Sequence, residues 1–315
     1  MTERQAWGAL PAGVRDRIGE ALGGPVRGFA PVGGGFSVGG VVGVVSADGR
    51  NRMFIKAVTQ DHPAAEDYRI EARVAAVLPA QVVTPALRLA HVADGWVVLG
   101  YEPVSGRVAH EPWVDDELDA ALATLRSSAR LLTPAPEVEV PSVVERMDGR
   151  CETWRRVAER GHCGPVQLGQ LGPWERANLA RLAELERGWV SRVAGNTLLH
   201  FDLRHDNCLI GEDGRMWFVD WGRACLGPPW IDLACLLLES DLGGRDPESL
   251  FARHELGAAA DAEAVDGFLV ALASYWTHVA ALPPPSGAAH LRRRQEHSRK
   301  TTIRWLMRRW SDPTR

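Results

Sequence analysis

One polar loop, set between short apolar runs, constrains the fold of this chain more than any other stretch. The runs Cys208–Ile210 and Met216–Val219 flank a Glu-Asp-Gly turn, which is typical of a hairpin, and Thr197–Leu199 precedes the loop as a third short strand. The loop and the end of the hairpin carry one imidazole and three oxygen-bearing side chains: His200, Asp202, Asn207 and Asp220. Such oxygens suit Mg²⁺, which takes few protein ligands and fills its other positions with water and phosphate.

The order and spacing of these residues match a known pair of motifs. His-x-Asp-x-x-x-x-Asn, from His200 to Asn207, followed by Asp-x-Gly at 220–222, is the catalytic-loop and metal-loop pair of the kinase fold. A buried hairpin with solvated turn acids is the alternative, and motif order, spacing and flanking strands argue against it. The downstream segment 227–234 differs from protein kinases. The chain resembles the aminoglycoside phosphotransferase and choline kinase-like family of small-molecule kinases, strongly over 198–236, moderately over 50–105 and weakly over its helical remainder.

The resemblance implies an α+β fold with two lobes like those of protein kinases. We expect a small antiparallel-sheet N-lobe over residues 1–99 that binds nucleotide, a hinge at 100–106, and a larger, mostly helical C-lobe at 107–315 that holds the catalytic and substrate residues. A length of 315 residues is sufficient for two lobes. Because backbone groups of the family's hinge face the adenine edge, Leu99 and Tyr101 are candidate nucleotide contacts.

Hydrophobic periodicity and turn residues predict the other elements. A first helix is indicated by Trp7, Leu10, Val14 and Ile18 at helical spacing. Strands are expected at Val41–Val45, Arg52–Val58, Val82–Leu89 and Trp96–Leu99, which make a sheet of about five strands with one helix at about 66–78. In the C-lobe we expect helices from Asp115 onward and at Val144–Arg160, Trp174–Val193, Asp232–Glu239, Ala260–Ala281 and 288–310.

A glycine-rich turn at 33–40 precedes the first of these strands, Val41–Val45. Glycine lacks the Cβ that would keep the backbone away from a phosphate, so such a turn can direct N–H groups at one. The candidate contacts are Gly34, Gly35, Phe36 and Ser37. An ordinary glycine-rich hairpin is the alternative.

Lys56 lies in the middle of the strand Arg52–Val58. Of 36 basic residues only Lys56 and Lys300 are lysines, and a phosphate-bridging site favours a compact ammonium over a guanidinium fork. A chance surface lysine is the alternative. The resemblance implies that Lys56 binds the α- and β-phosphates of ATP, and GTP is an open alternative. It also implies that Glu71, in the next helix, holds Lys56 in place. Glu66 is the rival carboxylate.

The resemblance also assigns roles around the polar loop. Asn207 and Asp220 would hold Mg²⁺, and Asp202 would accept the hydrogen bond of the acceptor hydroxyl. His200 would brace the loop. Asp232 would be a second bracing carboxylate, with a helix N-cap as an equally good alternative. Phe201 stands where the family most often has glycine.

Composition limits the class of protein and the compartment in which it works. Hydrophobic content of 45% and charged content of 24% are ordinary for a globular chain, and no apolar run approaches a membrane span. The N-terminus lacks a signal-peptide profile, and the five cysteines show no paired spacing. We therefore expect a reduced, cytoplasmic protein with no membrane partner, as a monomer or homodimer.

Charge is unevenly distributed. The net charge is −4, while residues 288–315 hold nine basic and two acidic residues, so residues 1–287 sum to −11. An acidic body argues against a nucleic-acid partner and favours a cationic small molecule. Glu239 and Asp241, just after one helix, are the preferred substrate carboxylates, because Asp115–Glu117 could simply satisfy a helix dipole.

These features favour an ATP-dependent phosphotransferase that moves the γ-phosphate to a hydroxyl of a small cationic molecule. An aminoglycoside-like antibiotic is the family default, which implies antibiotic resistance. Alternatives are a kinase of a metabolite such as choline or a sugar, and a nucleotide-binding pseudokinase, against which the intact motif set argues. Twelve tryptophans allow an aromatic cage for a quaternary ammonium, although core packing is the simpler interpretation.

Overall fold

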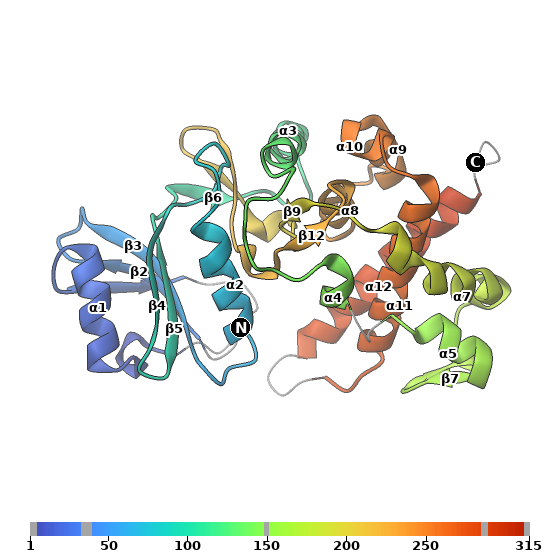
Figure 1. The fold of residues 1–315 in the computed structure, drawn as a ribbon, viewed down its shortest axis with the longest axis horizontal. Helices are drawn as coiled ribbons and strands as arrows, with labels where there is room; N and C mark the ends of the chain where they lie inside the picture. The colour runs from blue at the N-terminus through green and yellow to red at the C-terminus, as the bar shows by residue number, and fades with distance from the viewer. Residues whose placement is uncertain (1–4, 33–39, 148–150, 285–288, 312–315) are drawn as a thin grey trace.

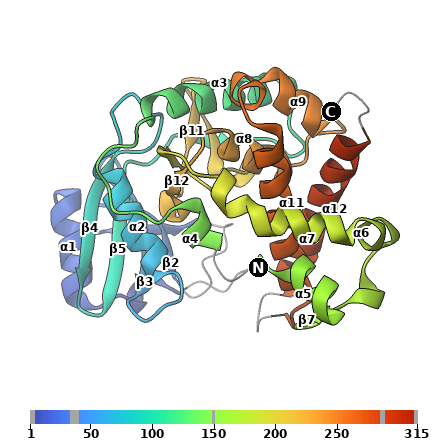
Figure 2. The same ribbon diagram turned by 45° about the vertical axis from the view of Figure 1, so that its right-hand side comes forward.

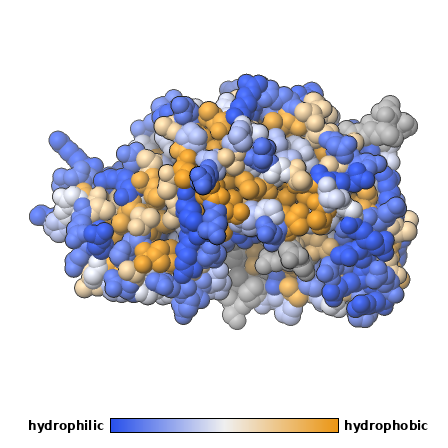
Figure 3. All heavy atoms as spheres, viewed as in Figure 1, coloured by the Kyte–Doolittle hydropathy of each residue, from blue (hydrophilic) through white to orange (hydrophobic). Residues whose placement is uncertain are grey.

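The computed structural model describes residues 5–32, 40–147, 151–284 and 289–311 (Figure 1). It has an antiparallel-sheet N-lobe and a mostly helical C-lobe, so the expected α+β, kinase-like fold class is confirmed. Apolar side chains gather over the middle of the face in Figure 3, and hydrophilic ones cover most of its lower right. No helix in the described part of the chain is long and apolar enough to cross a membrane.

The N-lobe is one five-stranded antiparallel sheet with a helix on each face. The strand order is β1-β2-β3-β5-β4, and α1 and α2 lie on opposite sides of the sheet, with α2 on the side of the C-lobe (Figure 1). The bounds are α1 Ala12–Leu22, β1 Gly28–Pro31, β2 Val41–Ser46, β3 Arg52–Thr59, α2 Ala65–Ala75, β4 Leu87–Ala93 and β5 Trp96–Tyr101. The central position of β3 buries Lys56 between its neighbours Val42 of β2 and Leu99 of β5.

Two N-lobe boundaries differ from the sequence-based expectation. The strand expected at Val82–Leu89 begins only at Leu87, because Pro85 lacks an N–H and the preceding backbone bonds locally, with Thr84 N donating to Val82 O. The first helix begins at Ala12, after a short 3₁₀ turn at Trp7–Ala9 and Pro11. Its apolar stripe is buried as expected.

The segment after the polar loop forms the hairpin that its turn residues predicted. β10 (Cys208–Gly211) and β11 (Met216–Phe218) are antiparallel, and β6 (Gly106–Val108), which begins at the last residue of the expected hinge, extends their sheet. β9 (Thr197–Leu199) pairs instead with β12 (Cys225–Gly227), a strand that the sequence did not indicate. These two small sheets fix both ends of the polar loop.

The C-lobe contains more and shorter helices than periodicity indicated. The helix expected at Val144–Arg160 is two helices, and the one expected at Trp174–Val193 breaks at Asn178, whose ψ of 8° is not helical. Two further helices, α9 and α10, precede α11. The bounds are α3 Asp115–Leu131, α4 Val143–Met147, α5 Thr153–Arg160, β7 His162–Cys163, β8 Val166–Gln167, α6 Pro173–Ala177, α7 Leu179–Gly188, α8 Trp230–Leu238, α9 Pro247–Arg253, α10 Glu255–Ala258, α11 Ala262–Ala280 and α12 Ala289–Trp310.

Helix α8 is the buried centre of the C-lobe. Every residue from Trp230 to Leu238 is buried, and Trp230 meets Phe251 and Phe268 edge to face. The short helix α4 stands between α2 of the N-lobe and the α11–α12 pair in both views (Figures 1 and 2). The loop that follows β9 therefore rests on a rigid base, with α4 at the junction of the lobes.

Candidate active site

Lys56 joins two carboxylates from different lobes. Its ammonium pairs with Glu71 of α2, and Nζ also lies 2.8 Å from Oδ1 of Asp220, which follows β11. Lys56 is only 7% exposed, whereas the side chain of Asp220 is 50% exposed. The pair with Glu71 therefore lies in a medium that screens it weakly, while water reaches the Asp220 side of the second pair. Tyr101 Oη donates a hydrogen bond of 2.9 Å to the other oxygen of Glu71. The rival Glu66 pairs with arginines on its own helix.

These contacts set the charge states of the site. Burial disfavours the charged form of Lys56, but Asp220 and Glu71 outweigh it and raise the pKa of the ammonium. Burial also raises the pKa of the Asp220 carboxyl, and Lys56 more than offsets this, so that the pKa falls to about 2. The site therefore presents one fixed cation and one fixed anion at neutral pH.

The loop from His200 to Asp202 is held from below by α8. Asp232 Oδ2 and Oδ1 accept hydrogen bonds of 2.8 Å each from the backbone N–H groups of His200 and Phe201. Asp232 lies inside α8, whose N-cap is Pro229, so it braces the polar loop that follows β9 and does not cap its own helix. Burial raises the pKa of the Asp232 carboxyl to about 6.

His200 is a fully buried brace. Its Nε2 donates to Val219 O at 2.9 Å, and its Nδ1 accepts from Asp202 N at 3.3 Å, an arrangement that requires the neutral ring. Burial lowers its pKa to about 4. Phe201 has a φ of 61°, the left-handed region that favours glycine, which is the residue that the family most often has there. The double hydrogen bond to Asp232 holds this strained turn.

Asp202 is held by two neighbours and remains reachable. Asn207 Nδ2 donates to Asp202 O at 2.8 Å and to Oδ2 at 3.1 Å, while Arg204 Nη1 donates to Oδ1 at 3.2 Å. Burial raises the pKa of the carboxyl to about 6, with Arg204 lowering it in part and the negative charges of Asp220 and Glu239 adding to the rise. Arg204 also pairs with Asp206, and the sequence analysis did not single out its contact with Asp202.

Asn207 and Asp220 fit a magnesium ion by the chemistry of their oxygens. Asn207 uses its amide nitrogen on Asp202, and Asp220 uses Oδ1 on Lys56, so each keeps one oxygen without a hydrogen bond to any described residue. Within the described residues no group of three His, Cys, Asp or Glu could hold a metal. A nucleotide-bound Mg²⁺ needs only one or two protein oxygens, because phosphates and water complete its shell.

The remaining nucleotide candidates are placed unevenly. Gly34, Gly35, Phe36 and Ser37 lie outside the described residues. Leu99 is fully buried in β5 and packs in the cluster beneath α2 with Tyr101. The side chain of Tyr101 therefore holds Glu71, a role that the alternation of β5 residues between two faces could have suggested.

A cavity of about 280 Å³ opens beside Asp202 in the C-lobe. Its wall includes Phe201, Glu239, Tyr275, Trp276 and Arg294. Glu239 Oε2 pairs with Arg294 Nη2 at 3.2 Å, while its Oε1 is buried and has no partner among the described residues. The structure thus brings one of the two candidate substrate carboxylates to the same cavity as Asp202, the candidate catalytic aspartate.

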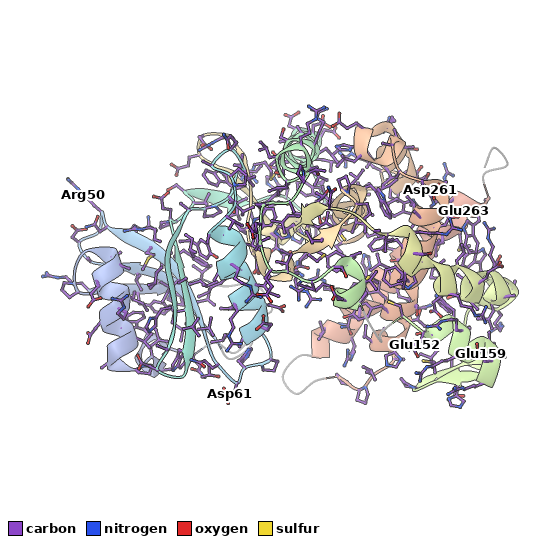
Figure 4. All side chains as sticks on the ribbon, in the orientation of Figure 1. Arg50, Asp61, Glu152, Glu159, Asp261 and Glu263 are labelled. Atoms are coloured by element: carbon purple, nitrogen blue, oxygen red, sulfur yellow. The ribbon has the colours of Figure 1, made fainter. Side chains whose placement is uncertain are left out.

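Asp241 lies outside this cavity. Its Oδ1 accepts from Gly243 N at 2.9 Å, and its backbone N–H donates to Glu111 at 3.3 Å. Other acids of the C-lobe lie at the far end from the N-lobe, as the labels Glu152, Glu159, Asp261 and Glu263 in Figure 4 show. The acid excess of the chain is therefore not concentrated at the cavity.

A lysine–glutamate pair in the N-lobe, facing an Asp-Asn loop and an Asp-x-Gly turn in the C-lobe, defines a kinase-like phosphotransferase. The chain belongs to the phosphotransferase enzyme family, whose model matches residues 30–282. It is thus a small-molecule kinase by family, and the suspected resemblance is confirmed. No curated protein matches the chain in a sequence comparison.

Solved structures with this fold share little sequence with the chain. Choline kinase LicA from Streptococcus pneumoniae has a TM-score of 0.59 at 14% identity, covering 94% of this chain and 98% of that one. A thermostable mutant of aminoglycoside phosphotransferase APH(4)-Ia, solved with ADP and hygromycin B, has a TM-score of 0.57 at 13% identity, with coverage of 94% and 98%. A putative fructosamine-3-kinase from Haemophilus somnus 129PT has a TM-score of 0.54 at 12% identity, covering 92% of this chain and 97% of that one. At such identities the likeness establishes the fold alone.

Proposed function

We propose that this protein transfers the γ-phosphate of ATP to a hydroxyl of a small molecule that binds in the cavity beside Asp202. The observation that carries the proposal is the position of Asp202. It faces the cavity on one side and, through Asn207, adjoins the candidate metal oxygens on the other. A hydroxyl in the cavity and a phosphate at Lys56 and Asp220 would then meet at this carboxylate.

Each residue of the site has a definite task in this reaction. Lys56 carries a fixed positive charge for the phosphates, and Glu71 with Tyr101 keeps it in place. Asp202 orients the acceptor hydroxyl and takes its proton as the bond to phosphorus forms. Mg²⁺, when bound by Asn207 and Asp220, supplies charge neutralisation on the phosphate oxygens. Solved relatives in complex with ADP and with AMP support the nucleotide assignment, and GTP remains an open alternative.

The charge of the cavity bears on the acceptor. Glu239 supplies one carboxylate, half of it already engaged by Arg294, and the aromatic rings of Tyr275 and Trp276 stand 4.6 Å apart on the same wall. Four arginines, Arg146, Arg204, Arg223 and Arg294, share the cavity wall with the carboxylates of Asp202 and Glu239, and each of them already pairs with a carboxylate. A single positive charge on an apolar body fits such a wall, beside Glu239 and the aromatic faces, better than several charges do. We therefore favour a monocationic alcohol over a polycationic aminoglycoside, which would need several acids. An antibiotic-resistance role, a cytoplasmic location and the oligomeric state stay predictions.

The test is release of ADP in the presence of Mg²⁺ and ATP. The acceptors would be three sets of hydroxyl compounds: monocationic amino alcohols, aminoglycosides and neutral sugars. Parent protein should release ADP with at least one set, and Asp202→Ala should lower kcat by about 10²- to 10⁴-fold, as expected for loss of a general base. A parent protein that binds ATP but releases ADP with none of them would support the pseudokinase alternative.

A further inference from the structure

Arg146, in the short helix α4, makes contacts that the catalytic scheme does not use. Its Nη1 donates to Asp67 Oδ1 at 2.9 Å, and its Nη2 donates to the carbonyl oxygens of Gly222 at 2.8 Å and Ala224 at 3.3 Å. Its side chain is only 9% exposed. One guanidinium therefore ties together α2 of the N-lobe, α4, and the turn that follows Asp220.

Two partners of Arg146, Asp67 and Gly222, lie close in sequence to the two carboxylates that pair with Lys56. Asp67 is one helical turn before Glu71 on α2, so the two positions lie on the same helix face. Gly222 is two residues after Asp220 in the Asp-x-Gly turn. Displacement of Arg146 would remove the hydrogen bonds that hold the turn against α2, and so would loosen the carboxylates on either side of the ammonium.

Close backbone packing makes this tie stiff. A Cβ added at Gly222 would lie 3.1 Å from Asp67 O and 3.3 Å from Asp67 Cβ, so the Asp-x-Gly turn touches the first turn of α2 directly. A planar fork with several donors suits a carboxylate and two carbonyls at once, whereas an ammonium offers a single point of attachment. Arg223 also approaches Asp67, at 3.5 Å, but bonds no carbonyl of the turn.

Arg146 also lines the cavity beside Asp202. The same side chain therefore borders the acceptor cavity and holds the turn that carries the candidate metal ligand. We propose that Arg146 is a positioning residue, which acts through the 220–224 turn to set Asp220 for the magnesium–nucleotide complex. This inference rests on the proposed function, since it concerns the same nucleotide site.

The experiment measures ADP affinity by calorimetry, once with Mg²⁺ and once with EDTA. The variants are Arg146→Met, which keeps the apolar stem and loses every donor, and Arg146→Lys, which keeps the charge. Arg223→Met is the matched control, because it removes the other cation at Asp67 without touching the carbonyls of the turn. The melting temperature of each variant without nucleotide reports any general loss of stability.

Positioning of Asp220 has a distinct signature. Arg146→Met should weaken ADP binding about tenfold with Mg²⁺, the size of a lost charge-assisted contact, and leave binding in EDTA unchanged. Arg146→Lys should recover part of the loss, and Arg223→Met should match the parent in both conditions. An equal loss with Mg²⁺ and EDTA would make Arg146 a general brace and overturn the proposal, as would no loss at all.

Two safeguards keep the outcome interpretable. If Arg146→Met does not fold, Asp67→Asn loosens the same tie from the α2 side. A magnesium-dependent loss of ADP affinity is again expected, and no such loss would contradict the proposal. A parent protein that binds no ADP in either condition would contradict the proposed function. That result is separate from any difference between parent and variant.

Discussion

Lys56 and Asp220 form an ion pair of 2.8 Å across the two lobes, although 164 residues separate them in the chain. Lys56 also pairs with Glu71, so its ammonium lies between a carboxylate of the N-lobe, Glu71, and one of the C-lobe, Asp220. Lys56 and Glu71 are both buried, so removing either one leaves an uncompensated buried charge, which is far more costly than the net stabilisation of the pair. The half-exposed Asp220 can instead be solvated. The relative placement of the lobes and the charge at the phosphate position thus depend on one lysine.

The first prediction concerns the shape of that cation. Lys56→Arg keeps the charge, but a guanidinium is too wide to lie between Glu71 and Asp220 at the same distances. We expect kcat/KM to fall roughly 100-fold, as for a misplacement of about 1 Å at a reacting centre. Steady-state kinetics, with circular dichroism as the folding control, would measure this. Parent-like turnover would mean that Lys56 is only a strand residue.

A second prediction separates Asp220 from the rest of the site. Asp220→Ala removes the carboxylate oxygen proposed for Mg²⁺ and one partner of Lys56. Even outer partners of metal ligands typically account for 10- to 100-fold in affinity or activity, so a fall of more than about 100-fold in kcat/KM is expected. ADP binding should also lose its dependence on Mg²⁺ in titrations. The metal assignment fails if Asp220→Ala keeps that dependence.

Sequence reasoning found the site because its parts follow local rules. Asp202 and Asn207 lie five positions apart in one loop, and β10 and β11 are joined by a turn whose residues indicate it directly. Glu71 was preferred over Glu66 from the family resemblance, and the structure pairs it with Lys56. Spacing within one loop or one hairpin determines which of its residues can meet, so those local pairs were accessible without coordinates. The pairing of Lys56 with Glu71 joins a strand to a helix and was accessible only through the resemblance.

Long-range pairings had no such signal. Arg146 meets Asp67 across 79 residues, and Arg294 meets Glu239 across 55, in a chain that contains 34 arginines. Periodicity tells which face of a helix is buried but not which distant charge lies opposite. The pairing of β12 with β9 was missed for a related reason, since the short run Cys225–Gly227 is too brief to show alternation.

The third prediction is the pH dependence of transfer. Burial raises the pKa of the Asp202 carboxyl to about 6, and only its ionised form can accept the hydroxyl proton. The value of kcat/KM should therefore reach its plateau well above pH 6, be halved near pH 6 and fall further below it. With the ordinary pKa of 3.8, the fall would come near pH 3.8. In Glu239→Gln this limb should move to lower pH, because the negative charge of Glu239 contributes to the rise. An identical limb in parent and variant would contradict that cause.

The last prediction tests the charge of the acceptor. Of the two candidate substrate carboxylates, only Glu239 lies at the cavity. Glu239 lines the cavity and keeps one oxygen without a partner, whereas Asp241 lies outside the cavity and bonds Gly243. The two residues carry the same charge two positions apart, so Asp241→Asn is the matched control for Glu239→Gln. For a monocationic alcohol, Glu239→Gln should raise the acceptor KM roughly fivefold, the size of a partly exposed ion pair of about 1 kcal/mol.

Added salt supplies the second arm of this test. Charges at an open cavity are screened over about 10 Å at 0.1 M salt, so the acceptor KM of the parent and of Asp241→Asn should rise together with ionic strength. The KM of Glu239→Gln should rise less, because the attraction that salt weakens is already gone and Arg294 has lost its partner beside the cavity. Equal effects of the two substitutions, or a parent KM indifferent to salt, would exclude a cationic acceptor held by Glu239. The assignment of Asp202 and Lys56 to phosphoryl transfer would stand in either case, since it depends on neither carboxylate.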